Sequence, residues 1–312
     1  MVRGMSRRQF FLILAAASGC AGLIVALAKD GNAKAGQGFH AFAQSLTAGI
    51  DSRLKGKVAS DGTRNLFAKK DHVAGKYTRN PNLWCADLVP QLTGCAVWKP
   101  PGEYAGERYG GVMITSRHIL FCRHSHPAWD GGWMKVQPQI IRFVTADNKT
   151  VDMKLIANVD SAADRDLSVG LLHEDVPPGI HIAQLMPALS ATQKAKLRQI
   201  RVPDLGISQA GLRPPKNEKH ESVAYVGPMR VPLEGARQPW GYEVYPGDSG
   251  TPRFYVTPAG LALYTLSGAG DADPQVIETL IAACDASAIQ RGVLKQATGK
   301  KLQFAKVTVP AE

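Results

Sequence analysis

Short apolar segments separated by turn-forming residues recur along the chain from about residue 92 onward. The intervening clusters contain Pro, Gly, Asn or Asp, as at Lys99–Gly102 and at Asp147–Asn148. This spacing is typical of short strands in an antiparallel sheet or barrel. The expected strands are residues 95–98, 111–115, 118–122, 140–144, 154–159, 167–172, 223–227, 242–245, 253–256, 261–267 and 303–309.

Two segments have the apolar spacing of a helix instead. Residues 39–54 predict an amphipathic helix, and residues 276–283 predict a second helix without an internal breaker. The rest of residues 29–90 is polar, and we expect this stretch to be an N-terminal extension or linker. The strands then fall into two β-units, at residues 91–180 and 181–312, with their connection near residues 173–190.

The N-terminal segment, residues 1–28, is typical of an export signal. Arg7 and Arg8 precede an apolar run from Phe10 to Ala28 that ends in small residues, and the paired arginines followed by Phe-Phe-Leu resemble a twin-arginine signal. Two alternatives are a membrane anchor or tether formed by residues 10–28 and a lipoprotein acylated at Cys20. In each case the rest of the protein lies outside the cytoplasm, in the periplasm or beyond the cell.

Net charge changes this picture little. The formal charge is +11, and three of these charges (Arg3, Arg7 and Arg8) lie in the N-terminal segment, so +8 remains without them. A basic surface favours acidic partners. Because no basic motif is interleaved with aromatic residues, we expect no nucleic-acid partner.

The cysteines permit one short disulfide. Cys85 and Cys95 are close in sequence and suit a small closed loop in an oxidising compartment. Cys122 and Cys284 lie among apolar residues, which is typical of buried thiols.

Residues 246–252, Pro-Gly-Asp-Ser-Gly-Thr-Pro, are the most informative stretch for chemistry. Glycines on both sides of Ser249 allow a tight turn in which peptide N–H groups converge. Converging donors of this kind stabilise an oxyanion, with each donor contributing about 2.7–4 kcal/mol. A polar turn between strands would have the same composition, so the segment alone leaves both interpretations open.

A serine nucleophile needs a base, and the sequence offers one upstream. An apolar strand beginning at residue 118 runs up to His124, which would lie at a sheet edge. Between the histidine and the serine, Asp166 opens the apolar run 167–172 and would be half-buried beside a cleft.

These three segments resemble those of the trypsin-like (chymotrypsin-fold) serine peptidases. Phe121-Cys122-Arg123-His124 stands where that family has Thr-Ala-Ala-His, and Asp166–Leu172 is loosely similar to its Asp-Ile-Ala-Leu-Leu motif. Residues 247–252 match Gly-Asp-Ser-Gly-Gly-Pro except for Thr251. The order His, Asp, Ser along the chain and the separations between the three also agree.

The resemblance implies an all-β fold of two six-stranded antiparallel β-barrels and an exported endopeptidase without cofactor or metal. Its substrate would be a protein or peptide. Ser249 would attack the scissile carbonyl, His124 would be the general base, and Asp166 would orient the imidazole. The peptide N–H groups of Gly247 and Ser249 would form the oxyanion hole, and water would hydrolyse the acyl-enzyme.

Several alternatives remain open at this stage. His118 and His126 compete with His124 as the base, and Asp164 and then Asp160 compete with Asp166. The set His118, His124 and His126 is also a weak metal-site hypothesis, since no nearby set of Cys, Asp and Glu completes an obvious ligand geometry. A different class of function is a catalytically weak, protease-fold binding protein of the cell envelope.

The sequence gives weaker signals for the specificity pocket and for the route of activation. Glu243 lies where the family often places the pocket floor, while Ser267 and Gly268 would form the wall. Arg123 beside the base would lower its pKa unless the guanidinium points away. Since no family-like N-terminal sequence occurs near residue 92, we expect Asp248 to have a partner other than a newly released N-terminus.

Overall fold

The computed structural model describes residues 37–71, 74–97, 110–125, 139–162, 165–208, 225–229, 233–241 and 248–310. The expected export signal, its anchor alternative and the expected strand 242–245 lie outside these residues. The chain divides into two compact units, residues 1–44 with 308–312 and residues 45–307. All site residues discussed below belong to the second unit.

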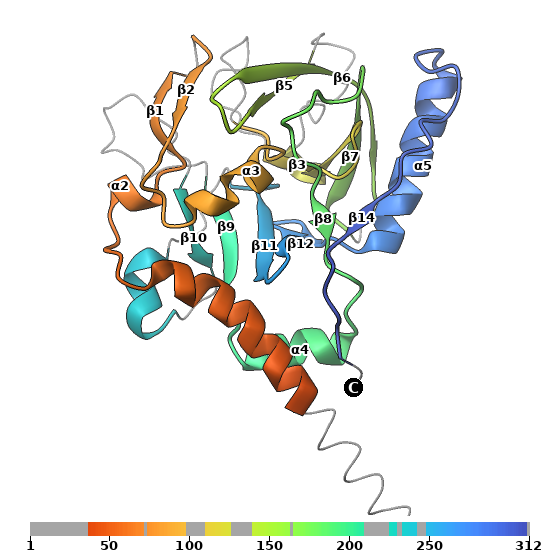
Figure 1. Ribbon diagram of the computed structural model, residues 1–312. Helices are drawn as coiled ribbons and strands as arrows, with labels where there is room; N and C mark the ends of the chain where they lie inside the picture. Colours follow the sequence, from red (N-terminus) through yellow and green to blue (C-terminus); the bar gives the residue numbers. More distant parts are fainter. Residues whose placement is uncertain are drawn as a thin grey trace, which may run out of the picture. The chain divides into compact units, whose positions relative to one another are not determined.

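One sheet of the second unit is antiparallel throughout (Figure 1). Its strand order is β3-β4-β7-β6-β5. The inner strands β4 and β7 are buried along their whole length, and apart from His118 and Ser168 they consist of apolar residues and glycine, as is typical of strands covered on two faces. The strands are β3 (Gly111–Met113), β4 (His118–Cys122), β5 (Gln139–Val144), β6 (Thr150–Asp160) and β7 (Leu167–Leu172).

The other sheet is mixed. Its order is β10-β9-β11-β12-β8-β14, with β13 also paired to β12. Strand β8 runs parallel to both β12 and β14, whereas the remaining pairs are antiparallel. The strands are β8 (Gln184–Leu185), β9 (Asp204–Ser208), β10 (Tyr225–Met229), β11 (Pro252–Thr257), β12 (Gly260–Leu266), β13 (Gly270–Asp271) and β14 (Gln303–Phe304).

The protein is therefore mostly β-sheet with few helices, as the sequence predicts. The described residues form a five-stranded sheet, a seven-stranded sheet and a small antiparallel pair of residues 67–71 with residues 76–79. Closure into two six-stranded barrels is not visible in this part of the chain and stays a prediction.

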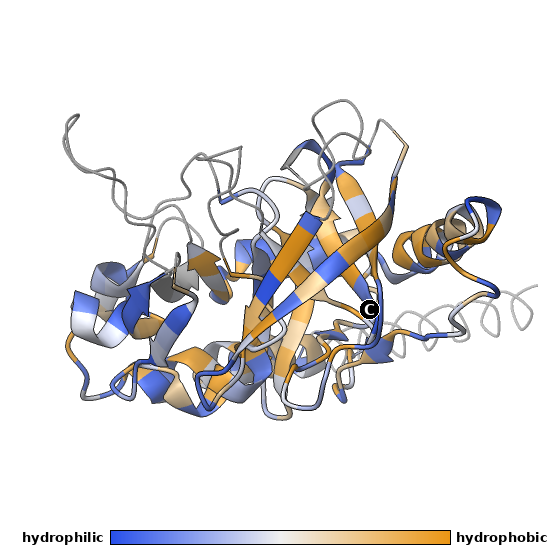
Figure 2. Cartoon of the chain, turned by 90° about the horizontal axis from the view of Figure 1, so that it is seen from above, coloured by the Kyte–Doolittle hydropathy of each residue, from blue (hydrophilic) through white to orange (hydrophobic). Residues whose placement is uncertain are grey.

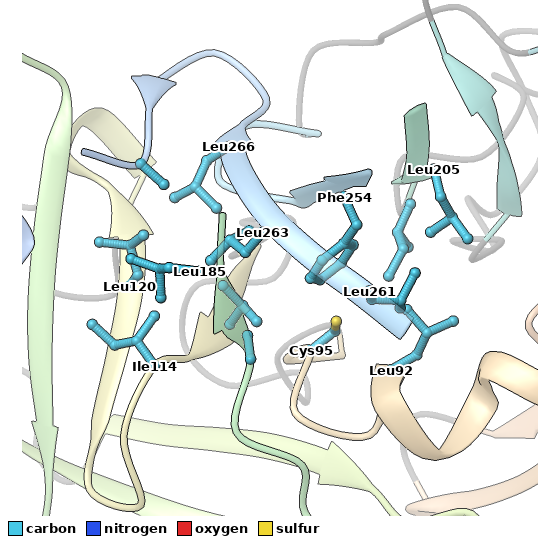
Figure 3. Packing of buried hydrophobic residues seen from close by; sticks show 14 of the residues in the cluster. Leu92, Cys95, Ile114, Leu120, Leu185, Leu205, Phe254, Leu261, Leu263 and Leu266 are labelled. Atoms are coloured by element: carbon cyan, nitrogen blue, oxygen red, sulfur yellow. The ribbon is translucent and has the colours of Figure 1, made fainter. Parts of the chain in front are cut away.

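One hydrophobic core cluster contains residues of both sheets. Figure 3 shows Ile114 and Leu120 of the five-stranded side near Leu185, Leu263 and Leu266 of the mixed sheet, and all five are at most 2% exposed. Burial of each such side chain contributes about 1.5–3 kcal/mol. This packing holds the C-terminal end of β4 in a fixed position relative to β11 and β12, the strands that follow Ser249.

Helix α5 (Pro274–Gln290) packs against β6 and β7. Asp273 caps it by accepting the Gln275 N–H, and Pro274 occupies the first turn. The predicted helix at residues 276–283 is confirmed but longer, because the start signal lies at Asp273-Pro274 and no glycine follows until Gly292. In Figure 2 this helix has mainly hydrophobic positions, with hydrophilic ones between them.

Residues 45–90 are folded together with the sheets that follow. The helix predicted at residues 39–54 is present at 37–54. Side chains from this stretch, such as Leu66 and Trp84, enter the same core cluster as the sheets. The other elements of this stretch, which reaches to residue 92, are α2 (Asp61–Arg64), β1 (Phe67–Asp71), β2 (Lys76–Arg79), a 3-10 turn (Ala86–Leu88) and α3 (Val89–Leu92). From residue 45 onward the stretch is thus part of the compact unit, and does not behave as the expected linker.

The four cysteines of the described chain are buried, and none of them forms a disulfide. The permitted disulfide between Cys85 and Cys95 is absent from the structure. Burial raises the pKa of Cys95 to about 12, so its thiol stays protonated at neutral pH. Among the described helices, none has the length and apolar character needed to cross a bilayer.

Candidate active site

His124 follows the end of β4 in a short 3-10 turn, Arg123–Ser125. The Arg123 N–H donates to the Asp166 carbonyl at 3.0 Å, which ties this turn to the start of β7. The Arg123 guanidinium lies 3.7 Å from the Asp160 carboxylate. Asp160 is therefore engaged in an ion pair with Arg123.

Asp166 immediately precedes β7 and faces His124. One carboxylate oxygen accepts the His124 peptide N–H at 3.0 Å, and the other is in a short hydrogen bond with imidazole Nδ1. Burial raises the pKa of Asp166, but hydrogen bonds from Cys122, the imidazole and the His124 N–H lower it by more. The net pKa is below the usual aspartate value, so the carboxylate is ionised at neutral pH.

Ser249 lies in a tight turn just before β11. The Thr251 N–H donates to the Asp248 carbonyl at 3.0 Å, and the Gly250 N–H donates to the Ser267 carbonyl at 2.8 Å. Gly250 has φ +79°, which favours glycine, and a Cβ there would lie 2.6 Å from the Gly110 carbonyl oxygen. The turn thus depends on the small residue that follows the serine.

The three predicted side chains meet across the two sheets. His124 Nε2 lies 2.8 Å from Ser249 Oγ, while Nδ1 of the same ring faces Asp166. The ring is 45% exposed and the Asp166 side chain 33% exposed, so solvent reaches the group. This arrangement can remove a proton from the serine hydroxyl and stabilise the imidazolium that results.

The nucleophile turn contacts the five-stranded sheet directly through Gly110. A Cβ at Gly110 would lie 2.3 Å from the Thr251 nitrogen and 2.8 Å from the Ser249 carbonyl oxygen. Such distances exclude any side chain at Gly110 unless the backbone moves. The glycine before β3 therefore lets the two halves of the site approach each other.

Asp248 is fully buried beside the nucleophile. Ser208, at the end of β9, donates its hydroxyl to the two Asp248 carboxylate oxygens at 2.9 and 3.0 Å. This hydroxyl is a partner of Asp248 from within the fold, as expected from the absence of a family-like N-terminal sequence.

Gly268 lies over the reacting atoms. A Cβ at this position would come within 3.4 Å of Ser249 Oγ and 3.6 Å of His124 Cε1. The neighbouring Ser267 is buried, and its Oγ has no hydrogen-bond partner among the described residues. Of the residues predicted for the specificity pocket, these two thus lie beside the nucleophile.

Other predicted residues lie elsewhere or outside the described chain. His118 is buried between Thr115 Oγ1 (2.8 Å) and Asp285 Oδ1 (3.2 Å), so it is not paired with Ser249 and does not join a three-histidine metal set. Gly247, Glu243, His126 and Asp164 are outside the described residues.

No protein-family model and no curated protein matches the chain. The resemblance to trypsin-like peptidases therefore depends on the three sequence motifs alone. The distances between the side chains of His124, Asp166 and Ser249 are a separate observation, taken from the structure.

Two residues beside this group were not anticipated as parts of it. Cys122 lies two positions before His124, and its sulfur contacts both His124 Nδ1 (2.9 Å) and Asp166 Oδ2 (3.1 Å). Cys122 stands within the motif at residues 121–124, but its sequence context indicates only a buried thiol. Ser208 had no sequence signal, since it is far from Asp248 along the chain and lies in a strand that the apolar pattern did not predict.

Proposed function

We propose that the protein is a serine endopeptidase that acts outside the cytoplasm. Ser249 attacks the peptide carbonyl while His124 Nε2 takes the hydroxyl proton, which gives a tetrahedral intermediate. The imidazolium then donates this proton to the leaving amine, and an acyl-enzyme remains. Water, deprotonated by His124, hydrolyses the ester and restores the serine.

The observation that carries the proposal is the hydrogen-bonded sequence Asp166–His124–Ser249. The 2.8 Å separation between Nε2 and Oγ is within the range for direct proton transfer. The ionised Asp166 favours the tautomer with a proton on Nδ1, which leaves Nε2 as the acceptor that a general base needs. Gly247 and Ser249 N–H groups as the oxyanion hole, Glu243 as the pocket floor and two six-stranded barrels are parts of the same proposal.

Export is proposed from the N-terminal segment, residues 1–28, alone. A twin-arginine-like signal carries proteins that have folded before transport, and the free buried thiols are compatible with folding in a reducing cytoplasm.

Covalent labelling tests the nucleophile directly. A fluorophosphonate probe should label the full chain and leave Ser249→Ala unlabelled, because the probe reacts with an activated serine. Ser287→Ala, a change on helix α5, is the matched control and should be labelled like the wild type. Equal labelling of Ser249→Ala and wild type would discard the proposed nucleophile.

Substrate class needs a second measurement. A casein digest or peptide library incubated with wild type and with Ser249→Ala should give cut peptides, identified by mass spectrometry, only with the wild type. Labelling without any cleavage would instead favour the catalytically weak binding protein as the function.

A further inference from the structure

The thiol of Cys122 lies against two side chains of the proposed triad, the imidazole of His124 and the carboxylate of Asp166. Its Sγ is 2.9 Å from His124 Nδ1 and 3.1 Å from Asp166 Oδ2. Each of the three residues offers one donor atom, and all these atoms lie within 4.8 Å of one another. Cys122 is fully buried, whereas the other two side chains are open to solvent.

One sulfur, one imidazole nitrogen and one carboxylate oxygen form a donor set that suits a zinc-like cation. Zinc bonds of about 2.0–2.3 Å at a tetrahedral centre place neighbouring donors roughly 3.3–3.7 Å apart. The three side chains would therefore separate by about 1 Å or less to admit an ion. The exposed sides of His124 and Asp166 give the ion a path from solvent, and water supplies the fourth ligand.

We propose that Cys122, His124 and Asp166 form a binding site for a zinc-like divalent cation, and that occupation of this site switches the hydrolase off. The site itself is independent of the proposed function, whereas the inhibition depends on it. The trypsin-like motif has an alanine at the position of Cys122, so the sulfur ligand belongs to this chain.

Inhibition follows from the proton balance. On binding, the Cys122 thiol loses its proton to solvent and becomes a thiolate, and the metal takes the lone pair of Nδ1. The proton that Nδ1 carried moves through solvent to Nε2. Nε2 then donates to Ser249 Oγ and cannot accept the hydroxyl proton, so the serine loses its base although it stays in place.

The other described cysteines provide a contrast. Cys284 is buried, and burial together with the nearby Asp285 carboxylate raises its pKa to about 12. Within the described part of the chain, Cys122 with His124 and Asp166 is the group whose donor atoms converge in this way. A variant at Cys284 therefore serves as a matched control for the loss of a buried thiol.

Cobalt(II) spectroscopy tests the site without any need for catalysis. The full-length Ser249→Ala protein titrated with Co²⁺ should develop a thiolate-to-cobalt charge-transfer band in the near ultraviolet. The band should be lost when Cys122→Ser is added to this background and should persist with Cys284→Ser. Serine keeps the size of cysteine, and circular dichroism checks that each variant is folded.

Inhibition is measured separately on the wild-type background. Zn²⁺ should suppress fluorophosphonate labelling reversibly, with recovery on chelation. The labelling rate of each protein is compared with its own rate without metal. The Zn²⁺ concentration that halves this rate should be at least tenfold higher for Cys122→Ser than for the wild type. Absence of the cobalt band, or its persistence with Cys122→Ser, would overturn the site. A cobalt band in a protein that never labels would retain the site and reject the peptidase.

Discussion

The hydroxyl of Ser208 lies 2.9 Å from one carboxylate oxygen of Asp248 and 3.0 Å from the other, and both residues are buried. Asp248 immediately precedes Ser249, so this contact anchors the nucleophile turn to strand β9. A hydroxyl already present in the folded chain does not have to be released by proteolysis. The site can therefore form on folding, without a processing step to supply this contact.

Replacement of Ser208 by alanine should destabilise the protein and lower its activity. The change withdraws a hydrogen bond from a buried carboxylate, and the expected loss in the free energy of unfolding is about 1–3 kcal/mol. Urea denaturation measures this loss, and the labelling rate measures activity. Ser168→Ala is a control of similar burial whose hydroxyl donates to the Val159 carbonyl. An equal fall in activity for both variants would contradict a special role for Ser208.

Substitution of Gly110 by alanine should damage the site without touching the triad. Its Cβ would overlap backbone atoms of Gly250 and Thr251, at 2.5 and 2.3 Å, which cannot rotate away. We expect a destabilisation of about 1–3 kcal/mol, and a fall in labelling rate of at least about tenfold from displacement of the reacting groups. In Gly62→Ala the nearest atom is the Ser60 hydroxyl at 3.6 Å, so this control should keep full activity. Wild-type labelling by Gly110→Ala would show that the turn tolerates displacement.

Asp166→Asn should lower the rate of peptide hydrolysis by about 10⁴-fold. The amide would favour the imidazole tautomer with its proton on Nε2, which cannot accept a proton from Ser249. Single-turnover kinetics separates this effect from binding, and circular dichroism checks the fold. A fall of less than tenfold would assign the orienting role to another carboxylate.

Acidification should destabilise the fold through His118. Burial lowers the pKa of this imidazole, Asp285 raises it, and the net pKa is below the usual histidine value. The group is therefore neutral when folded and protonates more readily when unfolded, so its stabilising contribution is present above about pH 6.5 and is lost as the pH falls toward the folded-state pKa. His181, whose pKa burial also lowers, acts in the same direction.

Urea denaturation at pH 7.5 and pH 5.5 measures this effect. His118→Gln should show a smaller loss of stability between the two pH values than the wild type, whatever its absolute stability. The exposed His40 provides the control, because His40→Gln should keep the wild-type pH dependence. An identical pH dependence in His118→Gln would contradict the assignment.

Export should depend on the paired arginines. Replacement of both Arg7 and Arg8 by lysine keeps the charge but removes the twin-arginine pattern, so the unprocessed chain should accumulate in the cytoplasm. Cell fractionation and immunoblotting measure this accumulation. Arg3→Lys is the control outside the pair and should be exported normally; export of the double variant would point to another route.

Local patterns predicted the central strands well. Strands β4 and β7 have the predicted bounds, because each is a mainly apolar run that is flanked by polar residues. The two-residue strand β8 offered no such pattern, since its parallel partners define it, and the strand predicted at residues 303–309 is present only as β14, Gln303–Phe304. The core contribution of residues 45–90 was missed because the apolar clusters that contain Leu66 and Trp84, residues 66–68 and 83–86, are too short to show a period.

The candidate site shows the same division. His124, Asp166 and Ser249 were found because each ends or begins an apolar segment with a distinctive motif. Residues that act through contact across the fold gave no such signal, and Ser208 is the clearest case. The proximity of Cys122 to His124 could be predicted in part, because residues two positions apart near the end of a strand share a face.

The pairing of Gln303 and Phe304 with β8 has a consequence for biosynthesis. The sheet that follows Ser249 gains this edge only after the ribosome has moved beyond Phe304, although the nucleophile itself is made well before that point. Completion of the mixed sheet therefore waits for the synthesis of Phe304, after Ser249 has already been made. Under the proposed twin-arginine export, such timing suits a transport machine that accepts folded cargo better than one that threads a growing chain.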